Sequence, residues 1–82
     1  MKVQAELSLY PLIQQDVVSV VDDYIEHLKE HDVEVEVGEM STHIIGESEN
    51  VFNAVRSAYE EVSIDKKCIL IAKFSNAFVK DL

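Results

Sequence analysis

The stretch Val33-Glu-Val-Glu-Val-Gly-Glu-Met-Ser-Thr-His-Ile-Ile-Gly46 decides the fold, because it holds two strand patterns with no helix between them. Residues 33–37 alternate valine and glutamate, which is typical of a strand covered on one face. Gly38 permits a turn or bulge after them. Residues 40–46 then predict a second strand. One face of this strand carries Met40, Thr42 and Ile44, and the other face carries Ser41, His43 and Ile45.

A strand and a helix are predicted on each side of this stretch. Residues 2–10 alternate apolar and polar side chains, and Pro11 should end that strand because proline has no amide donor. Residues 16–31 follow with apolar side chains at three- and four-residue spacing, which predicts an amphipathic helix. Residues 51–62 repeat this helical spacing. Residues 68–74 are apolar at nearly every position, so we expect a strand covered on both faces.

A short polar side chain stands at the start of each predicted helix. Asp16 is the expected N-cap of the first, and Ser48 or Asn50 of the second. Tyr24 and Phe52 occupy apolar positions of the two helical patterns. Residues 76–82 predict no more than a short helical turn or a tail.

The order β-α-β-β-α-β in a short chain predicts the α+β, ferredoxin-like arrangement, in which a four-stranded antiparallel sheet carries two helices on one face. We expect residues 1–82 to form a single domain. The first and third strands lie side by side at the centre of such a sheet. The helix-free face therefore juxtaposes Glu6, Ser8 and Tyr10 with Ser41, His43 and Ile45.

Charge and hydropathy exclude several classes of partner. The formal charge is −9, from 16 acidic and 7 basic side chains, which disfavours nucleic acids and anionic lipid surfaces. Apolar runs are far shorter than the ~20 residues that span a bilayer. The N-terminus has no basic region leading into an apolar segment, so we expect a cytoplasmic protein. The single cysteine, Cys68, fits that compartment and is interpreted as a small core residue.

The helix-free face of the predicted sheet is too apolar to remain in water. Tyr10, Ile45, Ile69 and Ile71 all point to it in the expected register. Apolar surfaces of this kind are usually buried against another subunit. We therefore expect a homodimer or homotetramer.

Polar side chains on the central strands and the helix start form a candidate ligand site. They are Glu6, Ser8, Tyr10, Ser41, Thr42, His43 and Glu47. Carboxylates stabilise a cation, hydroxyls bind ring nitrogens and amines, and a tyrosine ring stacks on a flat ligand. The alternative is structural: Ser41 and Thr42 fill a strand, and Glu47 favours a helix start. The residues alone leave both interpretations open.

Catalytic motifs are missing from the sequence. It has no nucleophile elbow, phosphate-binding glycine loop or paired-cysteine zinc site. Glu6 and His43 are the best acid–base pair, but such a pair on an open sheet is more often a structural hydrogen bond. His27 and His31 have a spacing that can bind a metal, yet no third ligand is evident. We expect neither an enzyme nor a metal or cofactor site.

Four short segments carry a resemblance to a known family. They are Ser8-Leu-Tyr-Pro-Leu12, Glu39-Met-Ser-Thr42, Ile45-Gly-Glu47 and Asn50-Val-Phe52. Together they resemble the thiamine-binding, YkoF-like family over most of the chain. The resemblance implies a ferredoxin-like fold, assembly into dimers and tetramers, and binding of thiamine or its hydroxymethylpyrimidine moiety without catalysis.

Two hypotheses from different classes follow. The first is a cytoplasmic binding protein for thiamine or hydroxymethylpyrimidine, with a role in thiamine salvage or transport. The second is a structural or regulatory interaction module that oligomerises through its sheet and binds no small molecule.

Overall fold

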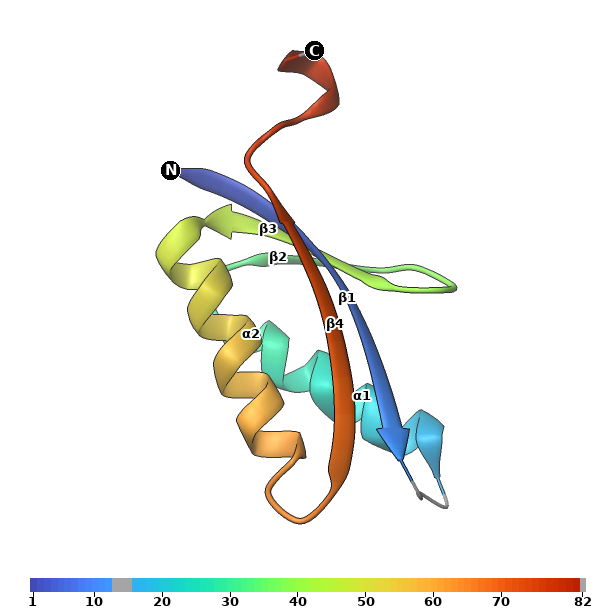
Figure 1. Cartoon of the computed structure of the whole chain (residues 1–82). Coiled ribbons are helices and arrows are strands. Elements are labelled where there is room, and N and C mark those ends of the chain that lie inside the picture. The colour runs from blue at the N-terminus through green and yellow to red at the C-terminus, as the bar shows by residue number, and fades with distance from the viewer. Residues whose placement is uncertain (13–15, 82) are drawn as a thin grey trace.

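The chain folds as a four-stranded sheet with two helices, in a computed structural model that describes residues 1–12 and 16–81. In chain order, the elements are β1 (Lys2–Leu12), α1 (Val17–Lys29), β2 (Glu34–Val37), β3 (Thr42–Glu47), α2 (Ser48–Val62), β4 (Lys67–Ser75) and a short 3-10 turn, Val79–Asp81 (Figure 1). The predicted β-α-β-β-α-β order of a ferredoxin-like α+β fold is confirmed. The predicted tail agrees with the short turn, and its last residue, Leu82, lies outside the described residues.

The sheet has the strand order β2-β3-β1-β4, and all three pairings are antiparallel. β1 and β3 are central, as the sequence predicts. His43 lies opposite Glu6 on one side and Glu36 on the other, and Glu6 lies opposite Lys73. A single row of ionisable side chains therefore crosses the helix-free face.

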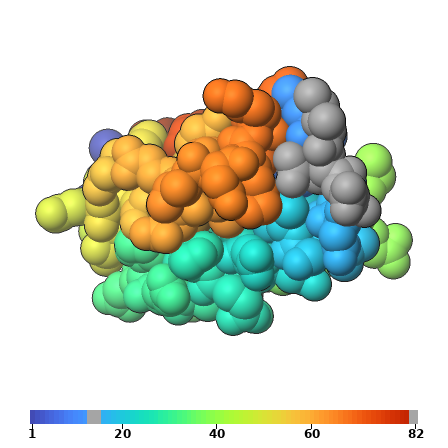
Figure 2. Space-filling view, turned by 90° about the horizontal axis from the view of Figure 1, so that it is seen from below, coloured from blue at the N-terminus to red at the C-terminus, as the bar shows by residue number. Residues whose placement is uncertain are grey.

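Both helices cover the other face and lie against each other, as Figure 2 shows from below. β1 buries Val3, Ala5 and Leu7 toward them, and β3 buries Ile44. These alternate positions point the same way because successive side chains of a strand face opposite sides. α1 and α2 complete the core with apolar stripes at helical spacing, including Leu28 from α1. None of the helices in the described ranges is long and apolar enough to cross a membrane.

The prediction that Pro11 ends the first strand is wrong, since β1 continues to Leu12 and pairs with β4 along the way. The direction of the backbone groups explains this. The Ser48 amide donates to the Met1 carbonyl over 2.7 Å, so Met1 directs its backbone groups toward β3. The N–H and C=O groups of successive residues in a regular strand point to opposite neighbouring strands. Every odd-numbered residue of β1 therefore directs its backbone groups toward β3. Proline is tolerated at position 11 because β1–β3 pairing has already ended, at Leu7 and Thr42.

The second helix begins earlier than expected. Asp16 caps α1 as predicted, with its side chain accepting from the Ser19 amide at 3.0 Å. By contrast, Ser48 is already helical, and Glu47 stands at the N-cap position without a side-chain cap bond. The Ser48 amide is instead satisfied by the Met1 carbonyl, so this helix start needs no side-chain cap for that donor.

Phe52, β4 and Met40 also differ from what the sequence pattern predicts. Phe52 is half-exposed and stacks on Phe74 of β4, with ring centroids 4.3 Å apart, because it lies at the edge of the helix stripe beside the last strand. β4 is covered on one face rather than two in the single chain, since Ile69 and Ile71 remain half-exposed on the helix-free side. The prediction that the third strand starts at Met40 is wrong, because Met40 lies in the β2–β3 turn, before β3 begins at Thr42, and is almost fully exposed.

Candidate functional site

The seven predicted site residues fall in three places. Glu6 and His43 lie in the middle of the helix-free face. Ser8, Tyr10, Ser41 and Thr42 surround one cavity at the end of β1. Glu47 lies at the opposite end of β3. The structure thus brings four of the seven residues together.

The side chains on the helix-free face satisfy one another. Glu6 lies 3.6 Å from the Lys73 ammonium through Oε1 and accepts from the Ser41 hydroxyl at 3.3 Å through Oε2. His43 does not contact Glu6 although the two are opposite in register. Its Nε2 lies 2.7 Å from Oε1 of Gln4. This arrangement is a cross-strand network in which Glu6, His43, Gln4 and Lys73 each have a partner.

Glu47 is removed from the other candidates by the length of β3. Its carboxylate lies 3.2 Å from the N-terminal ammonium, and both groups are well exposed. An exposed ion pair of this kind contributes little to stability. Glu47 lines a separate shallow cavity with Lys2 and Asn50. Its position is that of a helix-start residue rather than a member of the cavity beside β1.

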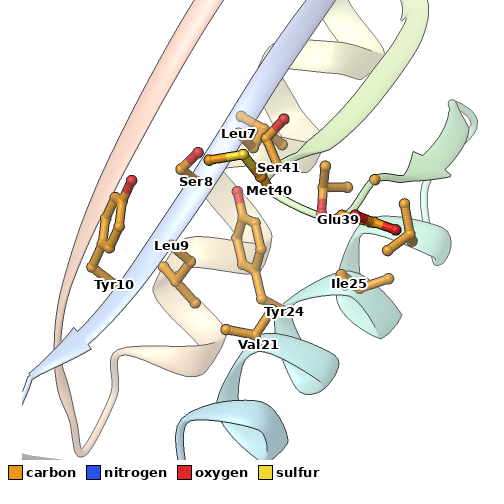
Figure 3. A pocket seen from close by; sticks show the side chains of 13 residues that line it. Leu7, Ser8, Leu9, Tyr10, Val21, Tyr24, Ile25, Glu39, Met40 and Ser41 are labelled. Carbon is orange, nitrogen blue, oxygen red and sulfur yellow. The ribbon is translucent and has the colours of Figure 1, made fainter.

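The cavity beside β1, here called the edge pocket, exists because β1 extends further than its neighbour. β1–β3 pairing stops at Leu7 and Thr42, whereas β1–β4 pairing runs on to Leu12 and Lys67. The β2–β3 connection folds back on itself instead of continuing the ladder, with the Gly38 amide donating to the Ser41 carbonyl at 2.9 Å. α1 closes the space from below (Figure 3). The cavity volume is about 200 Å³.

The edge pocket combines a polar rim with apolar walls. Its polar side chains are Ser8, Tyr10, Tyr24, Glu39, Ser41 and Thr42. Its larger apolar side chains are Leu7, Leu9, Val21, Ile25, Val37 and Met40. Mostly apolar walls with a few directed polar groups are the usual composition of a small-molecule site.

Tyr24 supplies the least expected group in the edge pocket. Its side chain rises from α1 between β1 and the Met40–Ser41 segment (Figure 3), and only 2% of the residue is exposed. Among the described residues, its hydroxyl is a buried side-chain polar atom without a hydrogen-bond partner. Burial raises the pKa of Tyr24 well above its usual range, so the hydroxyl stays protonated and available as a donor.

An unpartnered buried hydroxyl needs an explanation, because such a group costs about 1–3 kcal/mol. Tyr59 offers the contrast within the same core, since its hydroxyl donates to the Cys68 carbonyl at 2.9 Å. The site therefore holds a donor that a bound molecule can satisfy. Residues 1–12 and 16–81 contain no group of three or more His, Cys, Asp or Glu side chains arranged to hold a metal ion.

Sequence reasoning missed the residues that α1 contributes. Tyr24 and Val21 fit the helical core pattern, which does not distinguish a side chain that fills the core from one that faces a cavity. One signal was available, since tyrosine rather than phenylalanine at a fully buried position implies a use for the hydroxyl. Glu39 was quoted as a motif residue but not assigned to the site, although it lies at the rim.

Comparison with known proteins agrees with this architecture. The model of the YKOF-related family matches residues 2–76. The chain belongs to this family. No curated protein matches the chain by sequence.

Solved structures of similar proteins extend the comparison. A domain of unknown function, DUF77, from Bacillus cereus is 30% identical, with a TM-score of 0.79 over 94% of this chain and 77% of that one. The hypothetical protein MJ1052 from Methanocaldococcus jannascii is 29% identical, with a TM-score of 0.84 over 95% of this chain and 82% of that one. A Thermotoga maritima protein, TM0486, described as a candidate thiamine biosynthesis or salvage protein, is 20% identical, with a TM-score of 0.83 over 94% and 85%. The last likeness shows the fold alone.

Proposed function

We propose that this member of the YKOF-related family is a non-catalytic, cytoplasmic binding protein for thiamine or its hydroxymethylpyrimidine moiety, and that the edge pocket is the binding site. The unpartnered Tyr24 hydroxyl carries the proposal. A protein that buries a donor in a cavity beside Ser41 and Thr42 gains most when a ligand accepts from it. No further cofactor is required for this role.

Size and charge support the same ligand class. A cavity of about 200 Å³ is below the ~300–1,000 Å³ of sites for drug-sized molecules, so it suits a single substituted ring. The net charge of −9 and the carboxylate of Glu39 at the rim favour a ligand that carries or is attached to a cation. Thiamine is such a molecule. The family membership and the description of the T. maritima neighbour point in the same direction.

Titration calorimetry with hydroxymethylpyrimidine and with thiamine tests the proposal. We expect binding by the wild type, and about tenfold weaker binding by Tyr24→Phe, since one buried hydrogen bond contributes about 1.4 kcal/mol. Tyr59→Phe is the matched control. It removes a hydroxyl that lies outside the edge pocket, and its affinity should equal that of the wild type. Folded wild-type protein that gives no heat with either compound at high micromolar concentration would refute the proposed ligand class.

A second function, self-association through the helix-free face, is favoured by a separate observation. Tyr10, Ile69 and Ile71 are each about half-exposed on this face, and Tyr10 lies directly opposite Ile69. The row that crosses the face has Glu36 at one end and Lys73 at the other. A second copy, related by a two-fold axis that runs parallel to the sheet and perpendicular to the row, would set acid against base at both ends of the row. We therefore propose a homodimer or homotetramer built on this face.

Light scattering tests the assembly. The wild type should have a mass that is a multiple of 9.3 kDa, and Ile71→Glu should be a monomer, because it places a charge in the centre of the apolar patch. Ile64→Glu, at an exposed position of the α2–β4 connection, is the control and should assemble normally. A wild-type mass of 9.3 kDa at high concentration would contradict the proposed assembly and leave the edge pocket unaffected.

A further inference from the structure

The free edge of β1 presents backbone groups as well as side chains to the edge pocket. Met1 accepts from the Ser48 amide at 2.7 Å, and the register places Leu7 opposite Thr42. Hydrogen-bonded and non-bonded pairs alternate in an antiparallel ladder, so Leu7 and then Leu9 direct both N–H and C=O toward the β3 side. The β1–β4 register stays constant from Gln4 to Leu12, which shows that no bulge reverses this alternation.

Leu9 has no strand partner on that side in the described part of the sheet. Continuing the register would place Met40 opposite Leu9, but Met40 belongs to the turn that the Gly38–Ser41 hydrogen bond closes. Leu9 and Met40 both line the edge pocket. A backbone donor and a backbone acceptor of one residue therefore lie next to each other at the wall of the cavity, on the side where Tyr24 also lies.

We infer that the backbone of Leu9 reads the hydrogen-bonding edge of the ligand, so that the bound molecule takes the place of the missing β3 residue. The complementary ligand is a flat heteroaromatic ring with an acceptor nitrogen next to an exocyclic amine. The ring nitrogen accepts from the Leu9 amide, and the amine donates to the Leu9 carbonyl. This inference rests on the proposed function, because it describes how the same pocket selects a 4-aminopyrimidine.

Backbone recognition has a consequence for selectivity that side chains alone do not supply. A site built to hydrogen-bond a donor and an acceptor rejects an analogue that leaves one of them unpaired. Replacing the 4-amino group by methyl leaves the Leu9 carbonyl without a donor. Replacing it by an oxo group places the oxo oxygen, which is an acceptor, against the Leu9 carbonyl oxygen, which is also an acceptor. Hydroxyl side chains such as Ser8 and Ser41 can rotate to suit either analogue, whereas a strand backbone cannot.

Amide NMR on the isotopically labelled whole chain gives the direct test. On saturation with hydroxymethylpyrimidine, the Leu9 amide resonance should move downfield and its hydrogen exchange should slow by about tenfold or more. The Leu7 amide is the internal control, since it lies on the same side of the same strand and already has Thr42 opposite. Its exchange should change far less. Binding without any change at the Leu9 amide would overturn the inference and leave the proposed function standing.

Substitution at Leu9 gives an independent test. Leu9→Pro removes the N–H on the free side and no bond to β4, as Pro11 already does two residues later. It should weaken hydroxymethylpyrimidine binding by about tenfold, whereas Leu9→Val, which keeps the amide, should not. The 4-methyl and 4-oxo analogues should bind the wild type at least about tenfold more weakly than the 4-amino compound. Equal binding of all three would overturn the inference, and absence of binding by all three would refute the proposed function itself.

Discussion

The helix-free sheet face and the edge pocket both carry polar side chains, but they differ in what those side chains still need. On the sheet face, Glu6, His43, Gln4 and Lys73 already contact one another or Ser41. In the edge pocket, the Tyr24 hydroxyl is buried and has no partner among the described residues. The central side chains of the sheet-face row thus have partners, whereas the buried group without a partner belongs to α1, whose sequence pattern is that of an ordinary core helix.

A ligand gains more binding energy from the edge pocket than from the sheet face. A polar side chain in solvent or in a closed network gains little from a bound molecule, because it exchanges one partner for another. A buried donor without a partner gains the full value of a new hydrogen bond. Binding energy in this protein should therefore concentrate on the edge pocket, and the sheet face should contribute through assembly.

Filling the edge pocket should produce the largest effect. Val21→Phe adds a ring at a half-buried position of α1 that lines the cavity, so it should occupy the space that the ligand needs. We expect affinity for hydroxymethylpyrimidine to fall by about 100-fold or more, which corresponds to roughly 2.7 kcal/mol. Titration calorimetry with circular dichroism as a folding check measures this.

Two controls make that experiment specific. Val18→Phe is the same change on the same helix at an exposed position outside the cavity, and Glu6→Gln removes the charge at the centre of the sheet-face row. Both should keep wild-type affinity. If Glu6→Gln weakened binding as much as Val21→Phe, the ligand would lie on the sheet face rather than in the edge pocket.

A smaller effect should distinguish the buried Tyr24 from the partly buried Tyr59 by the stability of their phenylalanine variants. Tyr24→Phe removes an unsatisfied hydroxyl and should raise the free energy of unfolding of the ligand-free protein by about 1 kcal/mol. Tyr59→Phe leaves the Cys68 carbonyl without its donor and should lower it by about 1 kcal/mol. Thermal unfolding should show shifts of opposite sign, each of about 4–8 °C. A Tyr24→Phe variant that is as destabilised as Tyr59→Phe would mean that the Tyr24 hydroxyl has a partner in solution.

Alternation and helical spacing were sufficient to predict the order of the elements and the neighbours in the sheet. The facing of Glu6 and His43 followed from that order and is confirmed by the register. Side-chain polarity could not predict their contacts, because His43 bonds instead to Gln4, two residues before Glu6 on β1. Periodicity reports which side of an element is covered, and the rotamers on that side decide which atoms meet.

The site was harder to predict than the fold, because it depends on where one strand ends relative to another. Ser8, Tyr10, Ser41 and Thr42 were identified from their chemistry, and the structure gathers them in the edge pocket. Tyr24 was not identified, because its position in the helical pattern fits a side chain that fills the core as well as one that lines a cavity. The cavity itself arises from the unequal lengths of β1 and β3, which hydrophobic patterns do not determine to within a residue or two.

The proline at position 11 also protects the exposed strand edge from unwanted partners. An unpaired edge is a template for another strand, and therefore for aggregation. Within the described strand β1, only Leu9 and Pro11 direct their backbone groups to the free side after Leu7, and Pro11 has no amide N–H. An incoming polypeptide would find a single donor, too few to hold a strand in register, whereas a ring-sized molecule needs no more than that one. A residue that looks like a strand terminator thus favours small ligands over other chains at this edge.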